Sequence, residues 1–243
     1  MGVFSDDLER EVRLEYMRPE EVAAAKKAQP AIYVPFGSIE WHGYQNAVGL
    51  DAVKAHEQLV GLAARAGGVV YPAVFFGTGG GHGDYPSSYM VSAEPMIRLV
   101  TELLVRFDAD GYEKAILLSG HYPNRREYLD AAVEEYMKQS GGMRVLAIVE
   151  NEVEGVEGDH AAKYETSFMM YLHPRTVDLE RIRRKTDDIG GPEEVVNWMK
   201  DTGEDHPCYG IVGIDPRAHA SEDVGREGVE NLLAFLARWL AEA

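Results

Sequence analysis

The chain contains a single cysteine, Cys208, among its 243 residues. One thiol cannot form an intrachain disulfide, so nothing in the sequence requires an oxidising compartment. A metal site built from several thiolates is excluded for the same reason. A lone cysteine can act as a nucleophile, but a residue without a chemical role is the simpler interpretation.

Basic residues are also scarce. The chain has 24 Lys and Arg against 41 Asp and Glu, which gives a formal net charge of −17 at pH 7. Nucleic acids and anionic membranes are bound through Lys and Arg, so we expect neither as a partner. An acidic surface suits a protein that meets cations, although acidic residues also simply confer solubility.

Long apolar runs are absent. No run approaches the roughly 18 residues of a membrane span, and the N-terminal stretch MGVFSDDLEREVRLEYM lacks the apolar segment of a signal peptide. We therefore expect a soluble, cytoplasmic protein. With 45% hydrophobic and 27% charged residues, the composition is that of a globular protein, and we predict one domain over residues 1–243.

Short apolar runs alternate with helical patterns, which is typical of an α/β protein with a parallel sheet. We predict strands at residues 31–36, 68–76, 114–118 and 144–150. We predict helices at residues 19–27, 51–65, 94–108, 160–171 and 221–241, and one after SGHYPNR that ends near residue 138. The polar stretch 185–207 is predicted to be a surface excursion.

Polar residues gather in the loops that follow three of these strands. Loops 37–50, 77–88 and 119–124 each combine histidine with glycine. Ligands of an open parallel sheet bind at the carboxyl ends of its strands. The three loops are therefore predicted to form one shared site.

The first motif is GSIEWHG, in which Glu40 and His42 stand two residues apart directly after a strand. Residues i and i+2 of an extended segment point to the same side, so a carboxylate and an imidazole can converge there. Asp51 follows at a predicted helix start. It is a candidate ligand, but an acidic residue at this place also serves as an N-cap.

Two further motifs supply histidine and glutamate. His121 ends an apolar strand beside Gly120, which lets the backbone approach a ligand closely; the alternative is a plain turn into a helix that begins with Pro123. In GDHAAKYETS, His160 and Glu165 are separated by about 140° around a helix. They need not share a face, and Glu165 can equally lie on a solvated helix surface.

Without His160, the candidates Glu40, His42, Asp51, His121 and Glu165 offer two imidazoles and three carboxylates. A shared carboxylate can bridge two metal ions at a spacing of roughly 3.5–4 Å. Mixed nitrogen and oxygen ligands suit Zn²⁺ or Mn²⁺, and also Fe²⁺. The candidate metal ligands are Glu40, His42, Asp51, His121 and Glu165.

Five segments, in the same order, resemble the creatininase (creatinine amidohydrolase) family. PFGSIEWHGYQNAVGLD resembles its G-S-x-E-Q-H-G pattern with a later Asp, and HGDYPSS resembles its H-x-x-F-P-G-T loop. SGHYPN resembles N-G-H-G/Y-x-N, and GDHAAKYETS resembles H-A-G-x-x-E-T-S. GIDPRAHASEDVGREG resembles the late G-D-P segment, so the resemblance extends from residue 31 to residue 228.

The resemblance implies a three-layer αβα sandwich with a mostly parallel central sheet, a dinuclear metal centre and a homo-hexamer. It implies that Glu40 and His121 bind one ion and that His42 and Glu165 bind the other. Asp51 would bridge the two ions, which we expect to be Zn²⁺, with Mn²⁺ and Fe²⁺ as alternatives. His160 would lie near the reacting centre as a proton carrier, and Glu165 is counted with it among the catalytic residues.

The sequence departs from the family pattern at four points. Trp41 replaces Gln, residues 43–45 replace Gly-Pro-His, and Ala162 replaces Gly. Pro123 stands where creatininase proper has a metal-binding Glu. The resemblance therefore assigns that ligand to Glu165, as in other branches of the family.

We thus predict a metal-dependent hydrolase in which metal-activated water attacks a small cyclic or linear amide. His160 would carry the proton, and the backbone of residues 79–81 would steady an oxyanion unless this run is a flexible lid. One alternative is a hydrolase of a C–C bond in a cyclic polyol-derived diketone, and another is a non-catalytic metal-binding relative. A nucleotide-binding protein is disfavoured, because GTGGGHG lacks the P-loop Lys and does not open a helix as G-x-G-x-x-G.

Overall fold

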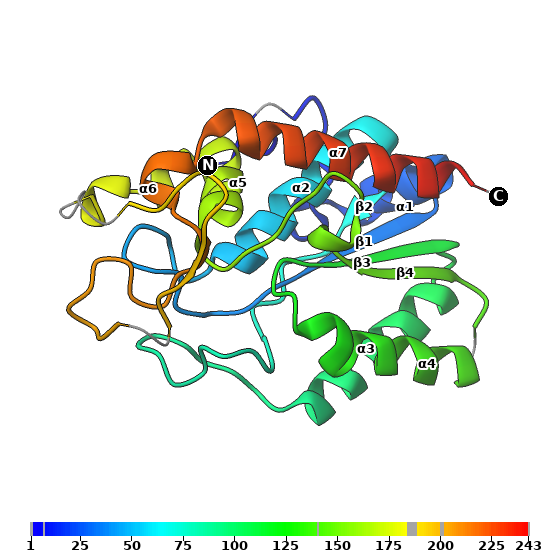
Figure 1. Ribbon diagram of the computed structural model, residues 1–243. Helices are drawn as coiled ribbons and strands as arrows, with labels where there is room; N and C mark the ends of the chain where they lie inside the picture. The colour runs from blue at the N-terminus through cyan, green and yellow to red at the C-terminus, as the bar shows by residue number, and fades with distance from the viewer. Residues whose placement is uncertain (1, 7, 140, 184–188, 200–201, 243) are drawn as a thin grey trace.

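A parallel sheet forms the centre of the molecule. The computed structural model describes residues 2–6, 8–139, 141–183, 189–199 and 202–242. Among these residues, the central sheet has four strands in the order β2-β1-β3-β4, all parallel (Figure 1). The strands are β1 (Ala31–Phe36), β2 (Val69–Val70), β3 (Lys114–Ser119) and β4 (Arg144–Val149). Apolar runs form β1 and β3, because both faces of these central strands are covered.

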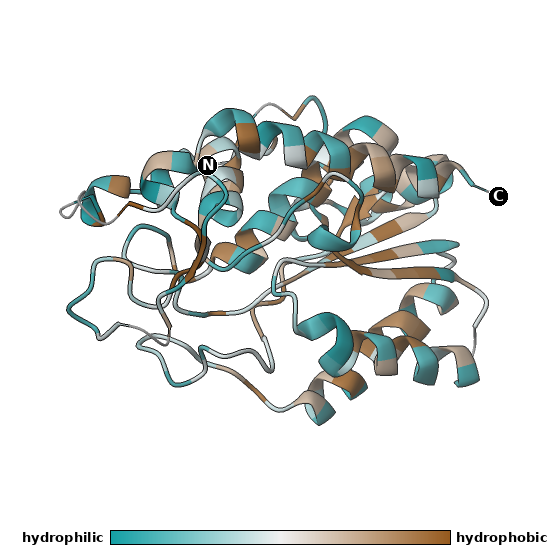
Figure 2. Ribbon diagram, viewed as in Figure 1, coloured by the Kyte–Doolittle hydropathy of each residue, from teal (hydrophilic) through white to brown (hydrophobic). Residues whose placement is uncertain are grey.

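Helices cover both faces of the sheet and complete three layers. One face carries α2 (Leu50–Ala66), α5 (Lys163–Leu172) and α7 (Glu222–Ala241), and the other carries α3 (Ala93–Ala109) and α4 (Asp130–Gln139) (Figure 1). Side chains of β1 alternate between the layers, with Tyr33 packed in one core and Ile32 in the other. Figure 2 shows the strands largely hydrophobic between helices whose outer sides are hydrophilic. The predicted αβα sandwich is confirmed.

The other elements are short or lie outside this core. They are α1 (Pro19–Ala28), α6 (Pro216–His219), a π-helical turn at Arg125–Leu129 that leads into α4, and 3-10 turns at Leu14–Tyr16, Glu150–Glu152, Pro174–Thr176 and Leu179–Arg181. None of the helices in the described parts of the chain has the length and apolar character needed to cross a membrane.

Two predicted elements are shorter than expected. The strand predicted at 68–76 is regular only at Val69–Val70, because Pro72 has no N–H to donate and the pairing resumes as a single bridge between Phe36 and Val74. The helix predicted at 160–171 begins at Lys163. His160 lies before this helix, because its backbone forms an antiparallel bridge with Val212.

The stretch 185–207, predicted to be a surface excursion, is partly built into the protein. Its residues 185–188, 200 and 201 lie outside the described residues. Val195–Asn197 forms β5, which pairs antiparallel with β6 (Val212–Ile214), and Trp198 is buried. The prediction of a surface segment was therefore wrong only for Trp198, because Val195 is exposed and the other described residues of 189–199 are at least partly exposed.

Candidate metal centre

A cavity of about 300 Å³ lies at the carboxyl edge of the sheet. The chain leaves β1 for α2 on one face and leaves β3 for α4 on the other, so the two loops separate there (Figure 1). Such a crevice is the usual ligand site of an open α/β sheet. The cavity is lined by Glu40, Asp51, Gly80, Gly81, His82, Gly120, His121, Tyr122, Pro123, Asp159, His160, Glu165, Met199 and Val212.

Glu40, Asp51 and His121 form the first group of candidate ligands. His121 Nδ1 lies 2.9 Å from Glu40 Oε2 and 3.3 Å from Asp51 Oδ2. All three residues are buried, and one ligand atom from each lies within 4.8 Å of the other two. The three side chains can therefore face a single cation.

His42, His160 and Glu165 form a second group on the same distance criterion. His42 Nε2 lies 3.1 Å from Asp51 Oδ1 and 3.6 Å from Glu165 Oε2. Glu165 is buried, so its alternative placement on a solvated helix surface was wrong. Asp51 thus directs Oδ1 towards this group and Oδ2 towards the first, as a bridging carboxylate would.

Asp51 is not the N-cap of its helix. The N-cap position of α2 is Gly49, and no side chain caps it. The carboxylate of Asp51 instead accepts a hydrogen bond of 2.7 Å from Ser38 Oγ and faces the two imidazoles. The N-cap interpretation of this residue was therefore wrong.

Two glycines let α2 approach the strand ends. A Cβ atom on Gly120 would lie 2.2 Å from the backbone oxygen of Asp51, and one on Gly37 would lie 2.1 Å from the backbone nitrogen of Ala52. Neither position has room for a side chain. We expected Gly120 to let a ligand approach; it lines the cavity, and it also lets the helix that carries Asp51 approach.

His160 is held by a backbone carbonyl. Its Nε2 lies 2.8 Å from the carbonyl oxygen of Trp41. A carbonyl only accepts hydrogen bonds, so in the neutral ring the proton is on Nε2 and Nδ1 has the free lone pair. Burial, followed by the neighbouring charges of His42 and His82, keeps the pKa of His160 well below its usual value.

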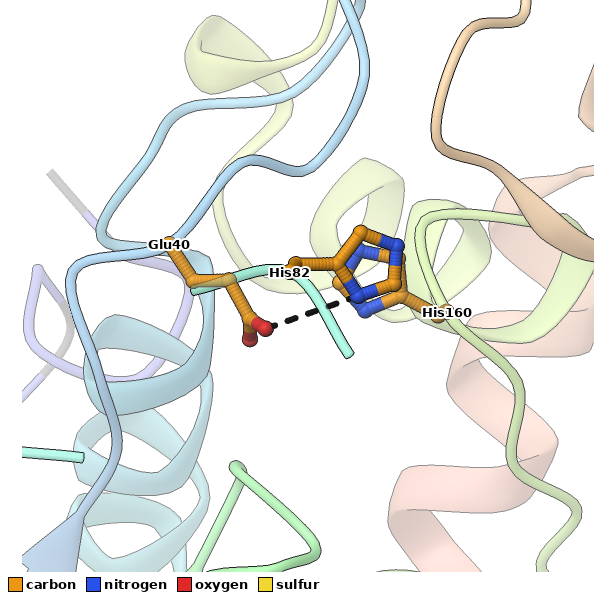
Figure 3. Close-up of side chains that lie close together, drawn as sticks. All are labelled: Glu40, His82 and His160. Carbon is orange, nitrogen blue, oxygen red and sulfur yellow. Dashed lines mark ion pairs between the residues drawn. The ribbon is translucent and has the colours of Figure 1, made fainter. Parts of the chain in front are cut away.

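His82 belongs to the site, and sequence reasoning did not select it. Its ring stacks on that of His160 with centroids 3.7 Å apart, and Figure 3 shows the Glu40 carboxylate pointing towards the pair. Its Nε2 lies 2.8 Å from the carbonyl oxygen of Gly210, and its Nδ1 lies 3.6 Å from Glu40 Oε1. The signal was present in the sequence, as a histidine in a glycine-rich loop after a strand.

The charges of the centre are unbalanced towards the acids. Burial acts to lower the pKa of His42, but Asp51 and other carboxylates outweigh it and raise the pKa to about 9. The same competition, with Asp51 and Glu40 as partners, raises the pKa of His121 to about 10. Protons on these rings offset negative charge that a bound cation would offset equally well.

The donor set fits divalent metal ions. Buried carboxylate oxygens and imidazole nitrogens are the ligands that Zn²⁺ and Mn²⁺ take in proteins. Asp51 lies between these two groups of candidate ligands, and Glu40, His82 and His160 form a third group on the same distance criterion.

Comparison with known proteins gives one consistent result. A family model described as "Creatininase: Creatinine amidohydrolase" matches residues 15–240. The creatinine amidohydrolase of Pseudomonas putida is 24% identical over 176 residues, which cover 62% of this chain and 67% of that protein. A solved mutant creatininase of the Zn–Zn type has a TM-score of 0.75 at 19% identity, covering 96% of this chain and 98% of the other. A solved manganese creatininase has a TM-score of 0.75 at 21% identity, covering 95% and 98%.

Proposed function

Because this chain belongs to the creatininase family, we propose that it hydrolyses the C–N bond of a small cyclic or linear amide with two divalent cations held in the centre described above. Family membership, the fold and the groups of candidate ligands support a metal-dependent amidohydrolase. The observation that carries the two-ion proposal is the place of Asp51, whose two oxygens face different ligand groups.

The proposed ligands divide between the two positions. Glu40 and His121 hold one cation, His42 and Glu165 hold the other, and Asp51 is shared. Zn²⁺ is the proposed metal, with Mn²⁺ or Fe²⁺ as alternatives, because the donors combine imidazole and carboxylate. When bound, two such cations lower the pKa of water towards neutrality and offset charge that develops on a carbonyl oxygen.

The residues of the chain handle the proton and the substrate. His160 accepts a proton at Nδ1 from the water that attacks the carbonyl and delivers it to the leaving nitrogen, while its Nε2–H stays hydrogen-bonded to the Trp41 carbonyl. Gly80 and Gly81 line the cavity, and in this proposal their backbone N–H groups donate to the oxyanion. The candidate ligands Glu40, Asp51, His121 and Glu165 lie buried in the cavity, while Gly80 and Gly81 at its edge are exposed. A cavity of about 300 Å³ suits a small-molecule substrate.

Metal analysis joined to a substrate panel tests this function. Protein purified without chelator should contain about two divalent ions per chain. It should hydrolyse a member of a panel of lactams and formamides, lose this activity on chelation, and regain it with Zn²⁺ or Mn²⁺. Protein that takes up fewer than two ions would contradict the dinuclear centre. Cleavage of a cyclic diketone, with every amide left intact, would contradict the substrate class.

The homo-hexamer implied by the family resemblance is part of the proposal. Light scattering of the purified protein measures the mass in solution, and a monomeric mass would contradict this assembly.

A further inference from the structure

A lysine is completely enclosed beside the proposed metal centre. Lys54 of α2 has no exposed surface, and its Nζ lies 2.7 Å from Glu150 Oε2 and 3.0 Å from Glu165 Oε1. The rings of Tyr122 and Phe168 lie 5.2 and 5.5 Å from the same nitrogen. A buried ammonium group is uncommon unless it is paired, so these contacts define what Lys54 does.

The two carboxylate oxygens of Glu165 have separate partners. Oε1 accepts the hydrogen bond from Lys54 Nζ. Oε2 accepts a hydrogen bond of 2.8 Å from the backbone N–H of Ala161 and lies 3.6 Å from His42 Nε2. Lys54 therefore occupies one oxygen and fixes the rotation of the carboxylate, so that the other oxygen faces His42.

We propose that Lys54 is a positioning residue that orients Glu165 as a ligand of one metal position only. The proposal rests on the proposed function, because it assumes that Glu165 and His42 hold a cation. Lys54 lies one turn after Asp51 on the same helix face, but its Nζ contacts a carboxylate of the second ligand group alone. Its loss should weaken the position formed by His42, Asp51 and Glu165 and leave the position formed by Glu40, Asp51 and His121 unchanged.

The rival explanation is that Lys54 only neutralises Glu150. This carboxylate follows β4 and is fully buried, so removal of Lys54 would leave Glu150 without its ion-pair partner, whereas Glu165 would keep His42 at 3.6 Å. Replacing Glu150 by glutamine at the same time removes that excess charge. The double substitution Lys54→Met with Glu150→Gln therefore separates neutralisation from positioning.

The experiment measures the affinity of each of the two ions by Zn²⁺ titration against a competing chelator. Wild type, Lys54→Met and the double variant are compared, with melting temperatures recorded on the same preparations. Lys163→Met is the matched control, because it removes a lysine charge from a partly exposed position on α5, two residues before Glu165. Replacing a residue that orients a metal ligand typically costs about 10–100-fold in affinity.

We expect one of the two ions to bind about 10–100-fold more weakly in Lys54→Met and in the double variant. The other ion should bind as in wild type, and the double variant should recover melting temperature without recovering the weakened affinity. Wild-type affinity for both ions in the double variant would overturn the positioning role. Wild-type affinity for both ions in Lys54→Met would overturn it as well. A wild type that binds fewer than two ions would contradict the proposed function itself, and the positioning role with it. If Lys54→Met does not fold, the double variant alone decides.

Discussion

Asp51 and Glu57 are carboxylates of the same helix, α2, and both are buried, but their surroundings differ. Asp51 contacts the rings of His42 and His121. Glu57 lies further along the helix, where its Oε1 accepts hydrogen bonds from the backbone N–H groups of Phe4 and Ser5, at 2.5 and 2.7 Å. Its Oε2 accepts a further one from Ser5 Oγ at 2.5 Å.

A structural carboxylate and a candidate metal ligand differ in the partners of their oxygens. The acceptors of Glu57 are occupied by donors of the N-terminal segment, and His173 Nε2 lies 3.6 Å from Oε2, so the carboxylate holds that segment against the helix. The neighbours of Asp51 are candidate metal ligands themselves, so this carboxylate belongs to a group that could hold a cation. The comparison predicts that substitutions on the two sides have effects of different kinds.

The largest effect is expected for Asp51→Ala. A shared carboxylate offsets the repulsion between two cations, so its loss should reduce metal content from about two ions per chain towards none and abolish hydrolysis. His42→Ala and His121→Ala, which each touch one ligand group, should lose less metal. Elemental analysis of the three variants measures this. If Asp51→Ala kept its full metal content and lost only stability, Asp51 would be a structural carboxylate like Glu57.

A smaller effect is expected for His160→Gln, on the same side of the comparison. As a proton carrier, His160 should matter for turnover, and its loss should lower the rate by about 10²–10⁴-fold. Metal content and melting temperature should stay near wild type. Loss of one ion would make His160 a ligand instead. Loss of stability, with unchanged activity per folded molecule, would make it a structural residue like Glu57.

The smallest effect is expected for Glu57→Gln. The neutral amide accepts hydrogen bonds more weakly than the carboxylate, so the free energy of unfolding should fall by about 1–3 kcal/mol. Metal content and turnover of the folded protein should not change. His160→Gln is the opposite case, because its turnover should fall while its stability stays near wild type. Urea unfolding gives the stability and elemental analysis gives the metal content. Loss of metal in Glu57→Gln would contradict the assignment of Glu57 as a purely structural carboxylate.

The stability difference between wild type and Glu57→Gln should also depend on pH. Burial acts to raise the pKa of Glu57, but hydrogen bonds from His173 and Ser5 outweigh it and lower the pKa below its ordinary value of 4.5. The ionised form therefore stabilises the fold above about pH 4.5, and this stabilisation is lost as the pH falls through the folded pKa. The difference should shrink in acid and stay constant near neutrality.

The sequence was sufficient to locate the central strands and to predict that the candidate ligands lie together at one cavity. β1 and the segment 115–118 of β3 are apolar runs because both faces of these strands are covered, so their positions follow from the local sequence pattern. Glu40 and His121 follow these strands directly, and parallel strands bring such residues to one edge. The gathering of distant motifs at one cavity was therefore predictable without coordinates.

Contacts between distant segments account for what sequence reasoning missed. His160 pairs with Val212 instead of joining the helix, and no local pattern signals this bridge. Lys54 has the appearance of an ordinary polar residue within a helix, because its burial depends on Glu150 and Glu165 far along the chain. The strand predicted at residues 68–76 was too long, because the prediction followed the apolar run and gave too little weight to the missing N–H of Pro72.

The closeness of Gly37 and Gly120 to the first turn of α2 bears on how this protein can evolve. Any substitution there must push the backbone that bears Asp51, so these two positions are closed to gradual change. Met199 and Val212 also line the cavity, but they come from the separate segment that contains β5 and β6. Substitutions at Met199 and Val212 would therefore reshape the cavity without displacing the backbone of Asp51.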